Sequence, residues 1–237
     1  MTIAVSYHET VNVLQGLNCT AAGPFERPEW FSLLAENTNG QVQLVMAQDS
    51  KEGIAALPLV RTGARLEPLL NWYSFTFAPI LTSQADAVAL LTAIASDLKQ
   101  RERRVTLWPL AGEDGSATML EQAFRQAGWL CARVQCDTNH VLPVNGRSFA
   151  EYLASRPGAL RTTLKRKSGH LEKEILTTFQ SSAWDIYEEI YSRSWKPEEG
   201  NPQLLRSFAE QEGRAGRLRM ALARHDGRPV AAQFWTV

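Results

Sequence analysis

The sequence lacks the features that identify several classes of protein. Its 237 residues include three cysteines, Cys19, Cys131 and Cys136, and no two of them have CxxC spacing. This odd number without that spacing argues against a disulfide framework and a zinc site, and indicates a reducing compartment. No apolar run approaches the roughly 18 to 20 residues of a membrane-spanning helix, and no signal-peptide pattern is evident at the N-terminus. We therefore expect a cytoplasmic protein without a membrane span.

Net charge and the common nucleotide-binding motifs are also missing. Lys and Arg together number 25, as do Asp and Glu, so the formal net charge is zero. This balance argues against a whole-protein electrostatic interaction with nucleic acid. The patterns GxSxG, GxxxxGK[ST] and GxGxxG do not occur, which excludes nucleophile-elbow, P-loop and Rossmann sites. The four histidines are widely separated in the sequence, so we expect no metal.

What the sequence does contain is ample apolar residues, 44% of the chain with seven Trp and nine Phe, and an alternation of strands and helices. Strands are predicted over residues 42–48, 53–60, 71–81, 105–110 and within 129–144, with helices over 27–37, 86–101 and 117–128. After Pro143 we expect helices over 148–155, 157–174, 182–195 and 201–213, a strand over 175–180 and a hairpin over 216–237. This order predicts an α/β (mixed α+β) fold whose mixed central sheets are flanked by helices.

An internal repeat relates the first hairpin to the last. A shift of 176 positions places Gly40 on Gly216, Ala47 on Ala223 and Ala55 on Ala231 without a gap. Hairpins of small apolar residues also resemble one another by chance. We favour duplication, because a helix rich in aromatic and leucine residues precedes both copies. The repeat predicts two lobes, residues 1–142 and residues 143–237.

The second lobe is shorter than the first. After its hairpin the first copy continues to residue 140, so by the same offset the second copy would need about 80 further residues. We therefore expect the second lobe to be incomplete, as a truncated product, or to have a partner chain covering the edge strand formed by residues 229–237.

Five segments carry a resemblance to a known family: "FERPEWFSLL", "GIAALPLV", "FAEYLASRPGALRTTLKRKSGHLEK", "IYSRSWKPEEG" and "LRMALARHDGRPVAAQFWTV". They resemble the GNAT-type acyltransferases of the FemAB-like group, in particular the bacterial branch linked to cellulose and exopolysaccharide biosynthesis. The resemblance implies tandem GNAT-like lobes and acyl transfer from acetyl-CoA, another acyl-CoA or an aminoacyl donor to an amine or hydroxyl. It implies no permanently bound cofactor, because acyl-CoA is a cosubstrate.

A segment dense in bases is the candidate donor site. Arg161, Lys165 and Arg166 lie on the predicted helix 157–174 and could hold the phosphates of coenzyme A, of a nucleotide-linked donor or of a tRNA. The apolar stripe would run through Leu160, Leu164, Leu171 and Ile175. The alternative is a solvated face balanced by Glu172 and Glu174, and the sequence leaves both interpretations open.

The segment "SRSWKPEEG" is the candidate acceptor site. Arg193, Trp195 and Lys196 are candidate substrate-binding residues, and the resemblance places Arg193 and Trp195 in an Arg-x-Trp-like element. Glu198 is a candidate base for the attacking amine, and Tyr191 a candidate acid for the departing thiolate. The alternatives are a helix end whose tryptophan packs in the core, and a tyrosine that packs with Trp184.

Two functions from different classes remain open. The first is an acyl-CoA-dependent N- or O-acyltransferase whose acceptor is a small molecule or a cell-envelope or polysaccharide-linked group. The second is a non-catalytic GNAT-like partner or regulatory module of a polysaccharide biosynthesis system. A nucleic-acid partner is expected only if the donor is an aminoacyl-tRNA. The aromatic segment Asn71–Leu81 is either a groove for a sugar or lipid, or core.

Overall fold

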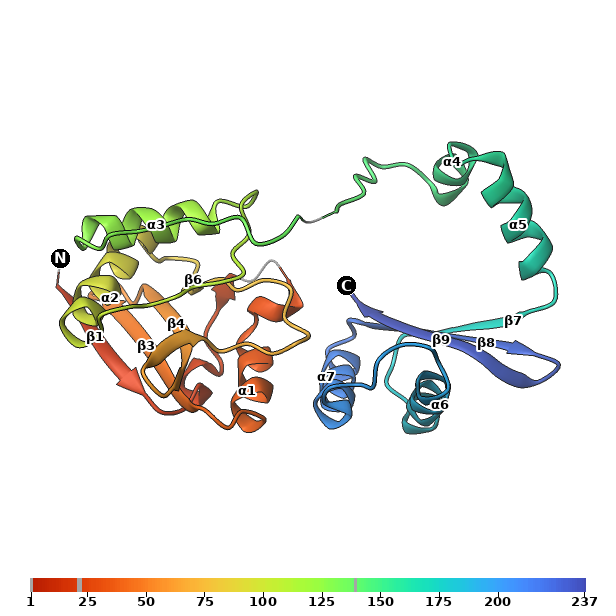
Figure 1. Cartoon of the computed structure of the whole chain (residues 1–237), viewed down its shortest axis with the longest axis horizontal. Coiled ribbons are helices and arrows are strands. Elements are labelled where there is room, and N and C mark those ends of the chain that lie inside the picture. The colour runs from red at the N-terminus through yellow and green to blue at the C-terminus, as the bar shows by residue number, and fades with distance from the viewer. Residues whose placement is uncertain (1, 21–22, 139) are drawn as a thin grey trace. The chain divides into compact units, whose positions relative to one another are not determined.

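The computed structural model describes residues 2–20, 23–138 and 140–237, and it divides the chain into two compact units. Unit 1 comprises Met1–Cys136 and unit 2 comprises Asp137–Val237. Each unit has a sheet and helices, so the predicted mixed α/β class is confirmed (Figure 1). Within the described residues the paired strands are antiparallel, and one isolated parallel bridge joins Leu66 to Val105.

Unit 1 is built on a sheet with the strand order β1-β3-β4-β6-β2, in which β5 also pairs with β4. The strands are β1 (Ile3–His8), β2 (Cys19–Thr20), β3 (Gln41–Asp49), β4 (Ile54–Thr62), β5 (Arg65–Pro68) and β6 (Ile80–Thr82). The helical segments are η1 (Asn12–Leu14), η2 (Pro24–Glu26), α1 (Pro28–Glu36), α2 (Ala87–Arg101) and α3 (Ser116–Gln126). Strand β4 is buried over its first six residues, because both of its faces are covered.

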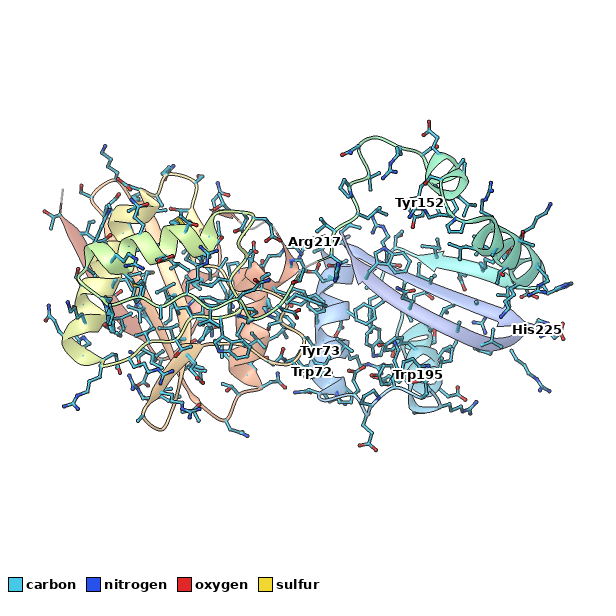
Figure 2. All side chains as sticks on the ribbon, turned by 45° about the horizontal axis from the view of Figure 1, so that its top comes forward. Trp72, Tyr73, Tyr152, Trp195, Arg217 and His225 are labelled. Carbon is cyan, nitrogen blue, oxygen red and sulfur yellow. The ribbon has the colours of Figure 1, made fainter. Side chains whose placement is uncertain are left out.

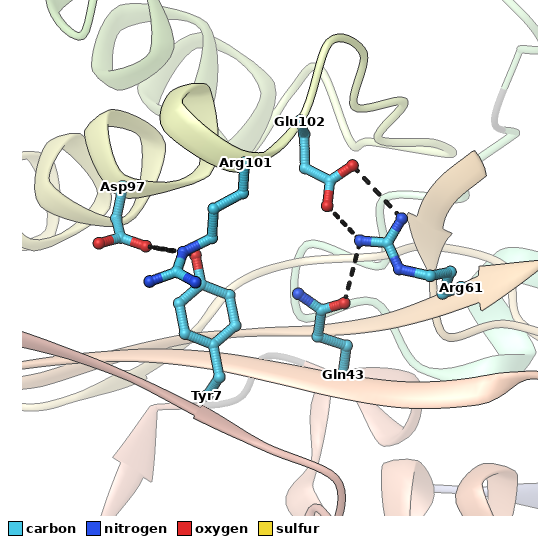
Figure 3. Close-up of polar contacts among 6 residues, drawn as sticks. All are labelled: Tyr7, Gln43, Arg61, Asp97, Arg101 and Glu102. Carbon is cyan, nitrogen blue, oxygen red and sulfur yellow. Dashed lines mark hydrogen bonds and ion pairs between the residues drawn. The ribbon is translucent and has the colours of Figure 1, made fainter. Parts of the chain in front are cut away.

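Polar contacts fix the helix α2 to one face of this sheet (Figure 3). The Tyr7 hydroxyl donates to Asp97 Oδ1 at 2.6 Å, and Arg101 lies over the Tyr7 ring. Arg61 of β4 forms an ion pair with Glu102 at the end of α2. Burial and the hydrogen bond to Asp97 raise the pKa of Tyr7, while the same hydrogen bond lowers the pKa of Asp97. These contacts join groups far apart in the sequence.

The predicted strand over residues 71–81 is wrong, since only Ile80–Thr82 are in a strand. The Asn71 side chain accepts from the Tyr73 backbone N–H at 3.0 Å, and such local bonds compete with a sheet ladder. Residues 71–74 therefore form a turn, which leaves Trp72 87% and Phe75 80% exposed. The core interpretation of this aromatic segment is correct for the fully buried Phe77 and wrong for Trp72 and Phe75.

The predicted strands over residues 105–110 and within 129–144 are also wrong. In the described residues of these segments only Val105 makes a bridge, and the rest are irregular. Pro109 has no backbone N–H to donate to a neighbouring strand. Its carbonyl oxygen accepts from the Phe77 N–H at 2.7 Å, outside any strand ladder. Strand propensity was present in both segments, but a strand also requires a paired neighbour.

Unit 2 is built on the sheet β7-β8-β9. Its strands are β7 (Glu172–Leu176), β8 (Leu218–His225) and β9 (Arg228–Thr236), and its helices are α4 (Phe149–Ala154), α5 (Gly158–Ser168), α6 (Ser181–Ser192) and α7 (Pro202–Arg214). Helices α6 and α7 lie on one side of the sheet (Figure 1). Leu218, Met220 and Leu222 are at most 3% exposed, whereas the alternate residues of β8 are partly exposed, as expected for a sheet covered on one face.

The basic helix is shorter than predicted, because α5 ends at Ser168 and β7 begins at Glu172. Leu171 and Ile175 are therefore not on this helix, and the predicted apolar stripe is wrong beyond Leu164. The segment Glu172–Leu176 pairs with β8 and so cannot belong to the helix. Here the pairing between strands outweighs the helical pattern of the local sequence.

The two hairpins have the register that the repeat requires up to the pairs Ala47–Ala55 and Ala223–Ala231, and next to the turn a β-bulge between Ala223 and Arg224 shifts the pairing in unit 2. Ala47 pairs with Ala55 in unit 1, and Ala223 pairs with Ala231 in unit 2, so the shift of 176 residues superposes the pairs. In addition, β3 pairs with β1 and β8 pairs with β7, each antiparallel. Both agree with duplication. The turn residues Asp226 and Gly227 have φ of 49° and 73°, the two positive φ angles of a tight turn in the hairpin predicted over 216–237.

Candidate functional site

A cavity of about 500 Å³ lies where α6 meets the loop that leads into α7. Helix α6 ends at Ser192, and Pro197 in the loop that follows is a residue that does not favour helix, while Asn201 begins α7 by accepting from the Leu204 N–H at 3.0 Å. The lining comes from α6, the loop and α7: Trp184, Tyr187, Glu188, Tyr191, Ser192, Lys196, Pro197, Glu198, Glu199, Pro202, Gln203 and Leu205.

Aromatic side chains form the α6 wall of this cavity. Trp184, Tyr187 and Tyr191 recur at helical spacing and therefore lie on one face of α6. The ring centroids of Trp184 and Tyr187 are 4.8 Å apart, and those of Tyr187 and Tyr191 are 6.0 Å apart. Phe234 of β9 meets Trp184 edge-on at 5.0 Å, so the wall is supported by the sheet. The expected packing of tyrosine with Trp184 is seen for Tyr187.

Tyr191 is connected to the loop. Its hydroxyl donates to the Pro197 carbonyl oxygen at 3.1 Å, and the Lys196 ammonium lies 5.6 Å from its ring centroid. Desolvation and the nearby Glu199 carboxylate raise the pKa of Tyr191, so its phenol holds its proton more tightly than an ordinary tyrosine does. A protonated phenol beside a cavity can donate a proton.

Glu188 is held by two donors, neither of which the sequence analysis identified as part of a site. Trp184 Nε1 donates to its carboxylate at 2.8 Å, and Arg206 of α7 donates at 3.2 Å. Arg206 also contacts Asp185 at 2.9 Å, so it ties α7 to α6 at the cavity wall. The spacing of Trp184 and Glu188 could have indicated their contact, whereas the role of Arg206 depends on how the two helices pack.

The residues proposed for acceptor chemistry divide into two groups. Tyr191, Lys196 and Glu198 line the same cavity. Arg193 and Trp195 do not: Arg193 pairs with Glu189 at 2.5 Å, and Trp195, labelled in Figure 2, is 91% exposed. The interpretation that Trp195 packs in the core is therefore wrong, and the roles of all five residues stay predictions.

The residues proposed for donor binding lie on α5. Arg161, Lys165 and Arg166 are exposed there, and no residue of this helix is buried. The geometry is that of a solvent-accessible basic face, which fits both a phosphate site and a solvated surface. Their role also stays a prediction.

Unit 1 has a second cavity, of about 520 Å³, beside α3. It lies between the two segments that fail to form strands, and Leu107, Phe124, Trp129 and Cys131 contribute to its walls. None of the residues selected from the sequence lines it. In the described ranges no group of three or more His, Cys, Asp or Glu side chains could hold a metal ion. Among those same residues, no helix is both long and apolar enough to cross a membrane.

Comparison with known families relates unit 2 to an enzyme class. Residues 158–237 match the family model described as acetyltransferase (GNAT) domain. The matched range begins at α5 and includes α6, α7, the sheet and the cavity between α6 and α7. No curated protein matches the chain significantly. The match supports a GNAT-type acyltransferase and acyl transfer in general; the FemAB-like and cellulose-linked assignment stays a prediction.

Proposed function

We propose that the protein is an acyl-CoA-dependent N- or O-acyltransferase whose acceptor binds in the cavity between α6 and α7. One observation carries this proposal: the range similar to GNAT acetyltransferases encloses a cavity lined by Tyr191, Lys196 and Glu198. A small molecule or the end of a cell-envelope glycan fits a cavity of about 500 Å³, which is within the usual range for ligand sites. We further propose that the chain consists of a GNAT-like lobe over residues 1–142 and an acyltransferase lobe over residues 143–237. We also propose that the protein acts in the cytoplasm.

In the proposed reaction the acceptor amine or hydroxyl attacks the thioester carbonyl carbon. Glu198 takes the proton that the nucleophile loses, and Tyr191 gives its phenolic proton to the departing thiolate. The acyl–sulfur bond breaks and an acyl–nitrogen or acyl–oxygen bond forms, after which exchange with solvent removes the proton from Glu198 and returns one to Tyr191. The place of Tyr191 in the cavity lining supports its role as the acid, because a phenol carries its proton at neutral pH.

Donor binding is assigned to the basic face of α5. The coenzyme A phosphates carry negative charge, and guanidinium and ammonium groups bind phosphate through charge-assisted hydrogen bonds. Arg161, Lys165 and Arg166 are exposed and so are accessible to such a ligand. Arg193 and Trp195, also exposed, would contact the part of the acceptor that extends out of the cavity.

Calorimetric titration with acetyl-CoA tests the donor assignment. The double variant Arg161→Glu/Lys165→Glu is expected to bind acetyl-CoA about tenfold or more weakly, because two charge-assisted contacts become repulsive. Its melting temperature should hardly change, since exposed charges add little to stability. The variant Lys51→Glu/Arg103→Glu makes the same charge change at exposed positions of unit 1 and should bind normally.

The results also distinguish the enzyme from the non-catalytic module. If the variant Tyr191→Phe transfers the acyl group more slowly than the wild type but binds acetyl-CoA with unchanged affinity, the role of Tyr191 as the acid is supported. If the folded wild-type protein binds neither acetyl-CoA nor coenzyme A, the proposal is wrong and the module interpretation is favoured. If the α5 variant loses stability but keeps its affinity, the basic helix is structural.

A further inference from the structure

We infer that the cavity of unit 1 beside α3 binds an extended, acidic peptide segment of another protein, which pairs as a strand with the backbone on either side of it. Residues of the segments 105–110 and 129–136 line the cavity, and α3 contributes a further wall. Its volume of about 520 Å³ is within the usual range for ligand sites. The cavity lies in unit 1, outside the range that matches the acetyltransferase family, so the inference is independent of the proposed reaction.

The first of these segments continues the sheet of unit 1. Val105 makes a parallel bridge with Leu66 of β5, and the Thr106 N–H donates to the Leu66 carbonyl oxygen at 3.2 Å. One side of the segment is thereby attached to the sheet. The N–H groups of Leu107 and Trp108 donate to no other backbone group in the part of the chain that the structure describes. A segment with such unpaired groups is a template for a further strand.

The second segment has no strand beside it. From Leu130 to Val134 no N–H donates to another backbone group within residues 2–20, 23–138 and 140–237. The Leu130 and Val134 side chains, which contribute to the cavity lining, are 98% and 81% exposed. Both segments have the composition of strands, and both lack a neighbour at the same cavity. One strand placed between them would supply that neighbour to each.

The walls of the cavity specify the side chains of the inserted strand. Leu120 and Phe124 of α3 are buried, and with Trp129 they give the cavity an apolar wall. Successive side chains of a strand point to opposite faces, so every second residue of the peptide meets this wall and should be apolar. In strand addition the backbone bonds give affinity, and pockets for alternate side chains give specificity.

The charge of the lining favours carboxylates at the remaining positions. Arg104 and Arg133 line the cavity, and Glu121 is its one lining carboxylate among the described residues. Glu121 accepts from Arg125 at 2.7 Å, whereas its nearest contact with Arg133 is 3.9 Å. Arg104 has no hydrogen bond or ion pair within the described ranges. Two guanidinium groups are therefore available to bind carboxylates of the peptide.

Titration of the ¹⁵N-labelled full chain with an acetylated and amidated pentapeptide, which alternates valine with glutamate, tests the inference. The amide signals of residues 107–108 and 130–134 should shift, and their hydrogen exchange should slow about tenfold at saturation, because these N–H groups gain acceptors. The same peptide with lysine in place of glutamate should bind about tenfold more weakly. Methylation of the backbone nitrogens of the glutamate peptide should abolish binding, because it removes the donors and leaves the side chains unchanged.

A charge reversal on the protein provides the complementary test. Arg133→Glu should weaken binding of the glutamate peptide about fivefold or more and strengthen binding of the lysine peptide. Arg228→Glu, the same change at an exposed position of the unit 2 hairpin, should alter neither affinity. Unshifted amide signals of β3 and β4 would show that each variant is folded.

Four outcomes would overturn the inference. If neither peptide binds, the cavity is not a peptide site, and if both bind equally, charge does not select the ligand. If the methylated peptide binds as tightly as its parent, the cavity takes an apolar acid without pairing to its backbone. If the amides of residues 130–134 become protected without peptide as the protein concentration rises, the occupant is a second copy of this chain.

Discussion

Removal of one partner of the ion pair between Glu212 and Arg217 should strongly destabilise unit 2. Glu212 is in the last turn of α7 and only 2% exposed, and its carboxylate accepts from the Arg217 guanidinium at 2.6, 3.0 and 3.1 Å. Arg217, labelled in Figure 2, immediately precedes β8. The variant Arg217→Ala would remove this guanidinium from a carboxylate that lies almost entirely out of contact with water.

The expected loss of unfolding free energy is about 2 to 3 kcal/mol. Breaking a fully buried ion pair by removing one partner typically costs about 3 to 5 kcal/mol. The Arg217 side chain is 30% exposed, so water can partly replace it, and the lower figure applies. Such a loss is a large fraction of the roughly 5 to 15 kcal/mol that stabilises a typical domain. The double variant Glu212→Leu/Arg217→Leu should recover at least half of it, because no charge is left buried.

Native-state hydrogen exchange is the suitable assay, because the chain has two compact units whose unfolding must be separated. Peptides from residues 202–225 report on α7 and β8, and peptides from residues 41–62 report on β3 and β4 as the control. The reasoning is refuted if Arg217→Ala lowers protection of the first group by less than about 1 kcal/mol, or if the double variant is as unstable as the single one.

Two further predictions concern packing and pH. A Cβ on Gly213 would lie 2.8 Å from the Phe179 backbone nitrogen, so Gly213→Ala should cost about 1 to 3 kcal/mol in urea unfolding, whereas Gly200→Ala, with open space around it, should be nearly neutral. Tyr7→Phe should cost about 1 kcal/mol at pH 7 by removing the donor to Asp97. Because the pKa of Asp97 is lowered on folding, this stabilisation is present above about pH 4 and lost as the pH falls through the folded value, so wild type and variant should converge in acid. Because the pKa of Tyr7 is raised, its contribution holds below about pH 10 and is lost above it; a constant difference across pH would contradict this account.

Several elements could be predicted because their signals are local. Asp86, the first residue of the predicted helix 86–101, accepts from the Ala89 N–H at the start of α2. Gly128 follows α3 with a φ of 81°, a conformation that favours glycine. Likewise, Asp226 and Gly227 set the turn of the last hairpin, and the repeat indicated its register.

The candidate site was only partly predictable. Tyr191, Lys196 and Glu198 were selected from a short segment and do line one cavity. The sequence could not show that Trp195 would point into water or that Arg206 would hold Glu188. These outcomes depend on how α6 and α7 pack, and no spacing within either helix specifies that.

The sequence by itself determined the class of fold, the ends of the capped helices and the two matching hairpins, because caps, turns and strand alternation act over a few neighbouring residues. Only the tertiary structure decided that Trp72 is exposed while Phe77 is buried, and that Glu172 begins a strand rather than extending a helix. It also decided that the cavity forms, since Phe234 supports Trp184 and Arg206 reaches Asp185 across long sequence separations. Burial and strand pairing of this kind depend on segments that are distant in the sequence and meet only in the folded protein, so a local sequence pattern cannot specify them.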